Sequence, residues 1–225
     1  MTARPAVMSW SSGKDSTMAL HVARQDPSLK VVALFSTFSE RADRVAIHGT
    51  RRPVARAQAA ALGLPLIEVD LPDPCPNAIY EERLGAAVRQ LMAEGVRDWI
   101  FGDLFLEDIR AYREAQLAPF DLTPHFPIWG RDTAALAQEM LDLGIDARIA
   151  TLDPGRVPAE LCGSCFDKAF LKALPETVDP CGERGEFHTI VADGPGFAHP
   201  IGLRRGETTQ RNGFAYTDFT LAPVS

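Results

Sequence analysis

The sequence lacks any long hydrophobic run, and no window approaches the 18 consecutive apolar residues of a membrane-spanning helix. Its first residues, "MTARPAVMSW", also lack the apolar core of a signal peptide. From these two absences we expect a cytoplasmic protein with no membrane partner. The composition is otherwise average: 46% hydrophobic and 24% charged residues are typical of a folded globular protein, which excludes wholesale disorder.

Positive charge and cysteine are scarce as well. The 23 basic residues stand against 30 acidic ones, giving a net charge of −7, so we expect no broad surface for nucleic acid. The four cysteines, Cys75, Cys162, Cys165 and Cys181, are too few for a disulfide scaffold. Only "CGSC" (162–165) has metal or redox spacing. We read reduced structural thiols, with a metal or a disulfide at 162–165 as the alternative.

Five short apolar runs alternate with five segments of helical periodicity. The runs resemble buried strands and cover residues 6–10, 31–36, 64–70, 98–103 and 146–152. The helical segments cover about 15–26, 51–62, 77–94, 107–117 and 132–143. This alternation predicts an α/β fold with a doubly wound, parallel five-stranded sheet and helices on both faces. Ligands should then bind beyond the carboxyl ends of the strands.

The character of the chain changes after about residue 155. Glycine and proline become frequent there, and "AYTDFTLAP" (215–223) alternates like a strand. We therefore expect a smaller, mixed α/β C-terminal domain. We place the first domain at residues 1–152 and the second at residues 153–225.

The loop after the first predicted strand, "SSGKDS" (11–16), has the composition of a phosphate site. Glycine allows an anion to approach the backbone, serines offer hydroxyl donors, lysine offers a charge, and a helix begins directly behind. The Walker P-loop is excluded, because Met8 and Asp15 occupy the places of its first glycine and its hydroxyl residue. The alternative is an ordinary Ser/Asp helix cap.

The same loop resembles the S-G-G-x-D-S loop of the PP-loop ATP pyrophosphatases, within the adenine nucleotide alpha hydrolase superfamily, with Ser12 in place of the first glycine. Four further stretches resemble one branch, the diphthine-ammonia ligase family: 56–66, 101–110, 127–141 and 178–189. The last, "VDPCGERGEFHT", is similar to the family's G-E-x-G-E-F-H-T signature. The resemblance implies a HUP-like ATP-binding domain over 1–152 that faces a substrate domain over 153–225 across a cleft.

The resemblance also implies a reaction. In the known ligase of this family, ATP adenylates a carboxylate of diphthine on elongation factor 2, pyrophosphate leaves, and ammonia displaces AMP to form an amide. We therefore expect an ATP-dependent, AMP-forming ligase that uses ATP and Mg²⁺. Its other partners would be a carboxylate substrate, protein-bound or small, and ammonia or an amine. A homodimer is left open.

The expected ATP contacts lie at the ends of three predicted strands: Ser11, Ser12, Gly13, Lys14, Asp15, Ser16, Leu34, Phe35, Ser36, Gly102 and Asp103. Lys14 would stabilise charge on the departing pyrophosphate. The backbone of Leu34, Phe35 and Ser36 would read the adenine edge. Asp15 and Asp103 are the candidate Mg²⁺ ligands, although we favour a helix-capping role for Asp15.

Expected catalytic residues are Lys14, Glu186 and His188, since an extended "GEFHT" would place Glu186 and His188 on one face to handle a proton. Expected substrate contacts are Arg110, Trp129, Arg131, Glu183 and Glu186. The alternatives are a helix cap for Asp103, a solvated helix position for Arg110 and core packing for Trp129.

Two other functions stay open from the sequence. One is a sensor or regulatory module that binds a nucleotide without chemistry. The other is a PP-loop tRNA-modifying enzyme that uses "CGSC" as a sulfur relay or cluster site, which the low basic content disfavours.

Overall fold

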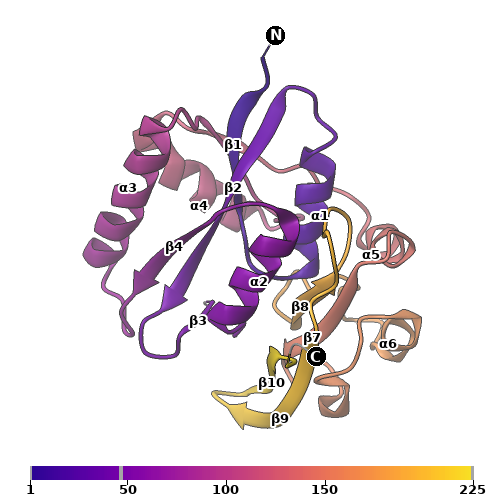
Figure 1. Cartoon of the computed structure of the whole chain (residues 1–225). Coiled ribbons are helices and arrows are strands. Elements are labelled where there is room, and N and C mark those ends of the chain that lie inside the picture. The colour runs from indigo at the N-terminus through magenta and orange to yellow at the C-terminus, as the bar shows by residue number, and fades with distance from the viewer. Residues whose placement is uncertain (1, 46–47, 224–225) are drawn as a thin grey trace.

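The computed structural model describes residues 2–45 and 48–223 and contains two sheets (Figure 1). In the first sheet, five parallel strands run in the order β4-β2-β1-β5-β6. Their bounds are β1 Arg4–Ser9, β2 Leu29–Ser39, β4 Leu66–Leu71, β5 Asp98–Ile100 and β6 Thr123–His125. A short strand, β3 (Arg44–Val45), pairs antiparallel with the end of β2. The predicted α/β fold with a parallel five-stranded sheet is confirmed.

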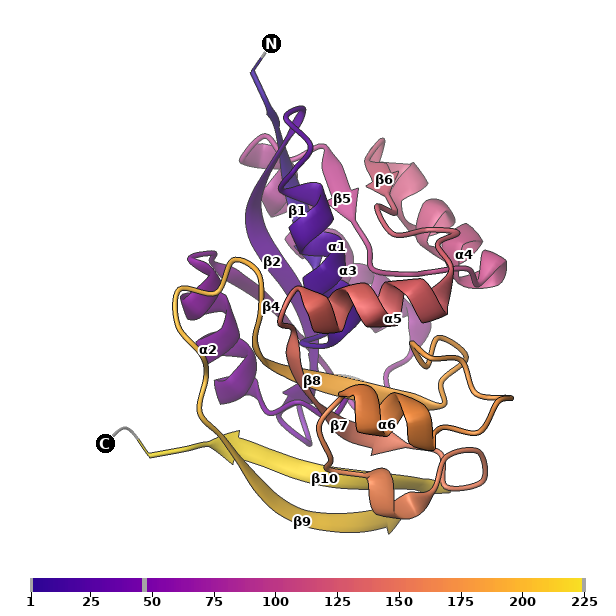
Figure 2. The ribbon, with the colours of Figure 1, turned by 90° about the vertical axis from the view of Figure 1, so that its right-hand side faces the viewer.

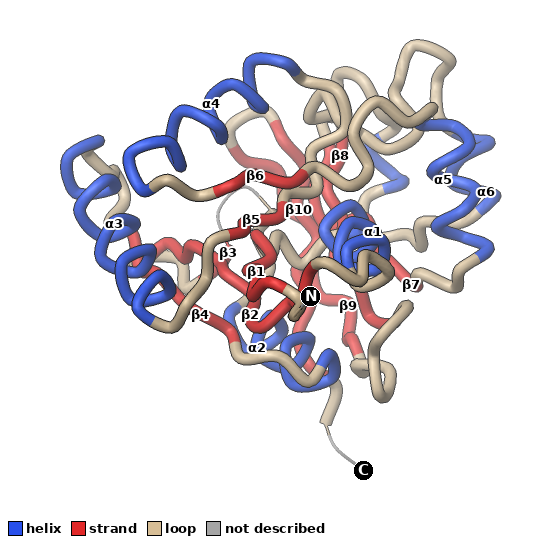
Figure 3. Tube along the Cα trace, turned by 90° about the horizontal axis from the view of Figure 1, so that it is seen from above, coloured by secondary structure: helices blue, strands red, loops and turns tan. Residues whose placement is uncertain are grey.

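Helices cover both faces of this sheet, as Figure 3 shows from above. Helices α1 (Lys14–Ala23) and α2 (Arg52–Leu62) lie on one face, and α3 (Asn77–Ala93) and α4 (Glu107–Leu117) lie on the other. Each follows a strand, and the first two crossovers lie on the opposite face from the last two, as a doubly wound sheet requires. A fifth helix, α5 (Thr133–Asp142), begins at Asp132, whose carboxylate accepts from Ala135 N–H at 2.8 Å.

The second sheet is antiparallel and has the order β8-β7-β10-β9. It is built from β7 Asp146–Leu152, β8 Phe187–Asp193, β9 Leu203–Arg211 and β10 Phe214–Leu221, with α6 (Lys168–Ala173) packed on it (Figure 2). The predicted strand at 146–152 therefore exists, but our expectation that it would be the fifth strand of the first sheet is wrong. A buried apolar run has the same pattern in either sheet, and β6 ("TPH") is too short and polar to have been recognised.

The core joins the two sheets. One cluster of buried side chains extends from β1 through α1 to the second sheet and includes Met8, Leu20, Ile149 and Phe187. A second cluster lies under α3 and α4, around Trp99 and Val88. Because α1 is packed on both sides, its N-terminal end is fixed between the two sheets. Among the described residues, no helix has both the length and the apolar character needed to cross a membrane.

Candidate active site

The loop between β1 and α1 has an unusual backbone conformation at Ser12. Its φ is +72°, the left-handed region that glycine adopts freely and that costs other residues about 1–2 kcal/mol. The Ser12 carbonyl accepts hydrogen bonds from Val191 N–H (2.9 Å) and from Gln58 Nε2 (3.1 Å). Ser12 therefore adopts a backbone conformation that is typical of glycine, at the position where the sequence departs from the S-G-G-x-D-S pattern.

Two glycines beside this loop leave no room for a side chain. A Cβ on Gly13 would lie 3.1 Å from the Thr189 carbonyl oxygen, and a Cβ on Gly102 would lie 3.0 Å from Ser16 N. Thr189 is also bonded to the loop, since its hydroxyl accepts from Lys14 N–H at 3.0 Å. The end of β5 and the start of β8 therefore press directly against the first turn of α1.

The start of α1 is held by a small network of hydroxyl groups. Gly13 N–H donates to Ser11 Oγ (3.3 Å), Ser11 Oγ bonds to Ser16 Oγ (3.1 Å), and Ser16 Oγ donates to the Gly13 carbonyl (2.9 Å). Gly13 is the N-cap, without a side-chain cap, so Asp15 does not have the capping role that we favoured. The first N–H groups of a helix have no intrahelical acceptor and attract anions.

Lys14 points away from the helix N-terminus and into the seam between the sheets. Its ammonium contacts both carboxylate oxygens of Asp15 (2.8 and 2.9 Å) and the Cys181 carbonyl, and it lies 5.5 and 5.3 Å from the ring centres of Phe166 and Phe187. Burial acts to lower the pKa of Lys14, but Asp15 and the other nearby acidic groups outweigh it and raise the pKa. Lys14 is a buried cation that holds Asp15.

A cavity of about 260 Å³ lies in front of this loop, and we call it the loop cavity. It brings together the end of β1, the first turn of α1, the end of β5, α4 and the "GERGEFHT" segment. Its lining residues are Ser9, Ser11, Asp15, Ser16, His48, Phe101, Gly102, Asp103, Leu106, Ile109, Arg113, Gly182, Glu183, Phe187 and His188. Motifs that are more than 80 residues apart in the sequence thus meet at one place.

Three carboxyl groups line the loop cavity. Glu183 accepts a hydrogen bond from Leu104 N–H (2.7 Å), and Asp103 lies 3.6 Å from Arg113. Burial, with the charges of Asp15 and Asp103, raises the pKa of Glu183 to about 7, and burial also raises the pKa of Asp103. The three carboxyl groups share the cavity with one guanidinium group, that of Arg113.

This donor set fits Mg²⁺ that arrives with a nucleotide better than a resident metal. Within residues 2–45 and 48–223, no three His, Cys, Asp or Glu side chains group closely enough to hold a metal. Mg²⁺ in nucleotide sites is bound by one or two carboxylates together with phosphate oxygens and water. Asp15 and Asp103 match that arrangement in chemistry.

Two histidines close one end of the loop cavity. The rings of His48 and His188 lie 4.6 Å apart, centre to centre. Burial lowers the pKa of His48 to about 4 and that of His188 to about 3, and the Lys14 ammonium adds to both shifts. Both imidazoles are therefore neutral at pH 7. The sequence reasoning missed His48, which lies outside every motif.

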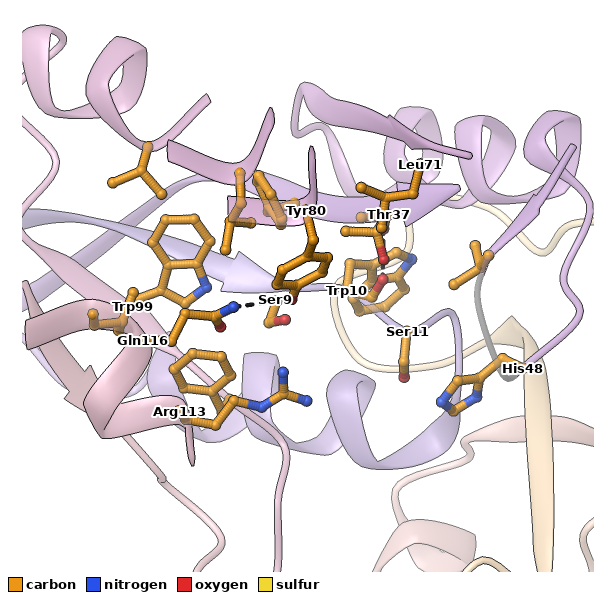
Figure 4. A pocket seen from close by; sticks show the side chains of 17 residues that line it. Ser9, Trp10, Ser11, Thr37, His48, Leu71, Tyr80, Trp99, Arg113 and Gln116 are labelled. Carbon is orange, nitrogen blue, oxygen red and sulfur yellow. Dashed lines mark hydrogen bonds between the residues drawn. The ribbon is translucent and has the colours of Figure 1, made fainter. Parts of the chain in front are cut away.

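A second cavity, of about 290 Å³, adjoins the first and is here called the nucleoside cavity (Figure 4). It shares Ser9, Ser11, His48, Phe101 and Arg113 with the loop cavity. Its other walls are mostly apolar or aromatic: Trp10, Phe35, Ser36, Thr37, Val45, Leu71, Tyr80, Leu84, Val88, Trp99, Gln116 and Leu117. Such walls suit a flat, apolar ring system with a few polar edges.

Polar groups are fixed at defined places in the nucleoside cavity. Gln116 Nε2 donates to the Tyr80 hydroxyl at 2.9 Å, and the Arg113 side chain points into the space between Tyr80 and Ser11 (Figure 4). Phe35 and Ser36 line the cavity, but Leu34 does not, because it is fully buried and its N–H donates to Pro65 O.

Eight residues expected in the site line neither the loop cavity nor the nucleoside cavity: Ser12, Gly13, Lys14, Leu34, Arg110, Trp129, Arg131 and Glu186. Glu186 is fully buried and its carboxylate bonds to Arg156 (2.7 Å) and to Asp179 N–H (3.2 Å). Arg110 lies over the rings of Phe126 and Trp129 on the outside of α4, and Arg131 pairs with Glu139. Neither Glu186, Arg110, Trp129 nor Arg131 lines the loop cavity or the nucleoside cavity.

The α4 arginine that lines both cavities is Arg113, one helical turn beyond Arg110. The sequence pattern suggested an arginine on this helix but did not show which face of the helix meets the sheet. The spacing of three residues between Arg110 and Arg113 could have indicated Arg113 as a second candidate, because residues i and i+3 lie on neighbouring parts of a helix surface.

Comparisons with known proteins agree with this arrangement along most of the chain. Residues 3–115 match the family model described as "Diphthamide synthase N-terminal domain", and residues 132–219 match "Diphthamide synthase C-terminal domain". A protein of Danio rerio named "Diphthine--ammonia ligase" is 28% identical over 181 residues, which cover 74% of this chain and 69% of that protein.

Proposed function

The chain belongs to the diphthamide synthase family, and we propose that it is an ATP-dependent, AMP-forming ligase that converts a carboxylate into an amide. The observation that carries this proposal is the loop cavity. There a helix N-terminus, three carboxyl groups and two neutral histidines meet beside a second cavity suited to a nucleoside. The Danio rerio relative, by its name, joins ammonia to diphthine, which is the reaction class that we propose here.

Amide formation from a carboxylate needs activation. Hydroxide is a poor leaving group, and a carboxylate anion repels a nucleophile. In the proposed reaction, a carboxylate oxygen attacks the α-phosphorus of ATP and the bond to pyrophosphate breaks. Ammonia then attacks the acyl carbon, and AMP departs with that oxygen. The protein supplies position and charge complementarity for both steps.

Each cavity has one part in this proposal. The aromatic walls of the nucleoside cavity hold adenosine, with Arg113 directed at the junction where phosphate enters. The first turn of α1, with the Ser11 and Ser16 hydroxyls, binds the phosphates that leave as pyrophosphate. Mg²⁺, when bound through Asp15 and Asp103, neutralises phosphate charge. Lys14 acts as a positioning residue, because it holds Asp15 and contacts no cavity.

Glu183 is the proposed proton acceptor. Its pKa of about 7 leaves it partly ionised at neutral pH, as a group that takes a proton from an attacking amine should be. It lies in the same cavity as the phosphate loop, and its position is fixed by the bond from Leu104 N–H. In this assignment Glu183 replaces Glu186, whose carboxylate is engaged with Arg156.

The proposal is tested by the nucleotide product. Purified protein is incubated with Mg²⁺-ATP, ammonium and elongation factor 2 that carries diphthine, and nucleotides are separated while the intact mass of the factor is recorded. We expect AMP, pyrophosphate and amide in equal amounts, each dependent on the acid and on Mg²⁺. ADP as the product would overturn the proposal. Tight ATP binding without acid-dependent AMP would favour a nucleotide sensor instead.

A further inference from the structure

A third cavity, of about 380 Å³, lies between the turn after β3 and the second sheet. It is lined by Arg44, His48, Gly49, Ala150, Thr151, Glu207, Thr209, Arg211, Tyr216, Thr217 and Asp218. Only His48 also lines the loop cavity and the nucleoside cavity. This volume lies in the range of cavities that bind small organic ligands.

Unpartnered polar atoms mark this cavity as a binding site. Thr151 is only 2% exposed, it lines the cavity, and its hydroxyl has no hydrogen-bond partner within the described residues. The Nδ1 atom of His48 is buried and equally without a partner there. A buried polar group left unpaired costs about 1–3 kcal/mol, so two in one cavity indicate hydrogen bonds that a ligand completes.

Charged groups of both signs line the cavity. Arg44 and Arg51 both bond to Asp218, at 2.8 and 2.7 Å, and lower the pKa of that carboxyl to about 2. Arg211 lies over the ring of Tyr216 at 4.3 Å. Two guanidinium groups, those of Arg44 and Arg211, and the two carboxylates of Asp218 and Glu207 therefore line the cavity, so its lining is polar and balanced in charge.

We propose that this third cavity, here the acid cavity, binds the body of the carboxylate substrate, a polar group of side-chain size whose carboxyl end passes His48 to reach the loop cavity. The inference rests on the proposed ligase function and assigns its acid site. His48 lies at the junction of all three cavities, and the neutral ring of His188 stacks beside it. Neutral imidazoles can donate a hydrogen bond to a carboxylate without forming an ion pair with it.

Two neighbouring positions on β9 give a matched pair of variants. Thr209 is exposed and lines the cavity, so Thr209→Trp fills the space without disturbing the core. Gln210 is also exposed, but its side chain is on the opposite face of the strand, so Gln210→Trp adds the same bulk outside the cavity. Thr151→Val removes only the unpartnered hydroxyl.

The test measures ATP affinity and the KM for diphthine-bearing elongation factor 2 in all four proteins. We expect Thr209→Trp to raise this KM at least tenfold and Thr151→Val about fivefold, as loss of one hydrogen bond implies. ATP affinity should stay within twofold throughout, and Gln210→Trp should match the wild type. Equal KM values for the two tryptophan variants would overturn the acid cavity while leaving the ligase proposal intact.

A readout that needs no turnover separates the two proposals. Hydrogen–deuterium exchange of the wild type is compared with and without the acid-bearing factor. Protection of residues 203–221 supports the acid cavity even if no AMP forms, a result that would count against the ligase proposal alone. Absence of protection there, with acid-dependent AMP formation present, overturns the acid cavity.

Discussion

The loop cavity and the acid cavity share the His48 side chain but differ in their charged groups. Three carboxyl groups line the loop cavity, and burial together with mutual repulsion raises the pKa of Glu183 to about 7. The acid cavity is lined by two arginines and two carboxylates, and the pKa of Asp218 falls to about 2. A cavity rich in carboxyl groups suits Mg²⁺ and an amine, whereas a charge-balanced cavity suits the polar body of a substrate. The two cavities therefore suit different reactants, which meet at His48.

The loop cavity depends on the close packing of the loop at residues 11–16, which Gly102→Ala would disturb. The added Cβ would lie 3.0 Å from the backbone of Asp15 and Ser16, which cannot yield as a flexible side chain can. We expect ATP affinity to fall about 100-fold and the free energy of unfolding to drop by about 1–3 kcal/mol. Binding of the acid-bearing factor should persist, as measured by the hydrogen–deuterium exchange protection of residues 203–221.

Gly155→Ala is the control for this change. Its Cβ would meet only the carboxylate of Asp153, at 3.2 Å, and it lies outside all three cavities. Calorimetric titration with ATP analogue should distinguish the two variants. Equal ATP affinity in both would contradict the close-packed loop.

Lys14→Met tests whether the buried ammonium group of Lys14 stabilises the fold. Removing the ammonium leaves the Asp15 carboxylate without its partner beside other acidic groups. Loss of one member of a buried ion pair typically costs about 3–5 kcal/mol, so we expect a loss of that size in urea unfolding. An unchanged free energy of unfolding with a large fall in kcat would instead mean that Lys14 acts directly on the substrate.

The fold could be predicted from the sequence more fully than the site. Hydrophobic periodicity placed the five helices α1 to α5. Helix α1 ends three residues before its predicted end, and the ends of the other four agree with the prediction within one residue. The same pattern could not assign residues 146–152 to a sheet, because partner choice depends on contacts with β8 and β10. It also missed β6, whose three residues "TPH" carry no apolar run.

Site residues were predictable where a motif fixes the backbone and unpredictable where tertiary packing decides. Two serines of the loop, Ser11 and Ser16, meet Gly102 in one cavity as the motifs suggested, together with Gly182, Glu183, Phe187 and His188. Glu186 belongs to that segment but turns inward to Arg156. His48 enters the site only because the turn after β3 lies against β8, a contact that no local pattern encodes.

Glu183→Gln tests the charge of Glu183 in the loop cavity through the pH dependence of the free energy of unfolding. The native pKa of about 7 lies above the ordinary value of 4.5, so the folded protein binds more protons than the unfolded chain between these values. The free energy of unfolding should therefore fall as pH rises from 4.5 to 7, and Glu183→Gln should remove that part of the fall.

The same substitution has a kinetic signature. The ratio of wild-type to Glu183→Gln activity should rise through pH 7 as the carboxylate form appears. Parallel pH–rate profiles for the two proteins would exclude Glu183 as the proton acceptor, whatever the effect on stability.

Ser12→Gly should have the smallest effect, and a favourable one. Glycine adopts φ +72° without the steric cost that serine bears, and the substitution removes a buried hydroxyl that has no partner in the described chain. We expect a gain of about 1 kcal/mol in the free energy of unfolding, with kcat unchanged. Asn212→Gly, at an exposed turn with φ +51°, is the control and should gain less.

In the proposed reaction the substrate carboxylate attacks the α-phosphorus of ATP, and this attack can be followed by oxygen transfer. The acid is labelled with ¹⁸O in its carboxylate and converted with ATP and ammonium, and the nucleotide and phosphate products are analysed by mass spectrometry. We expect one ¹⁸O atom in AMP and none in pyrophosphate. Label in inorganic phosphate, with ADP as the nucleotide product, would contradict it.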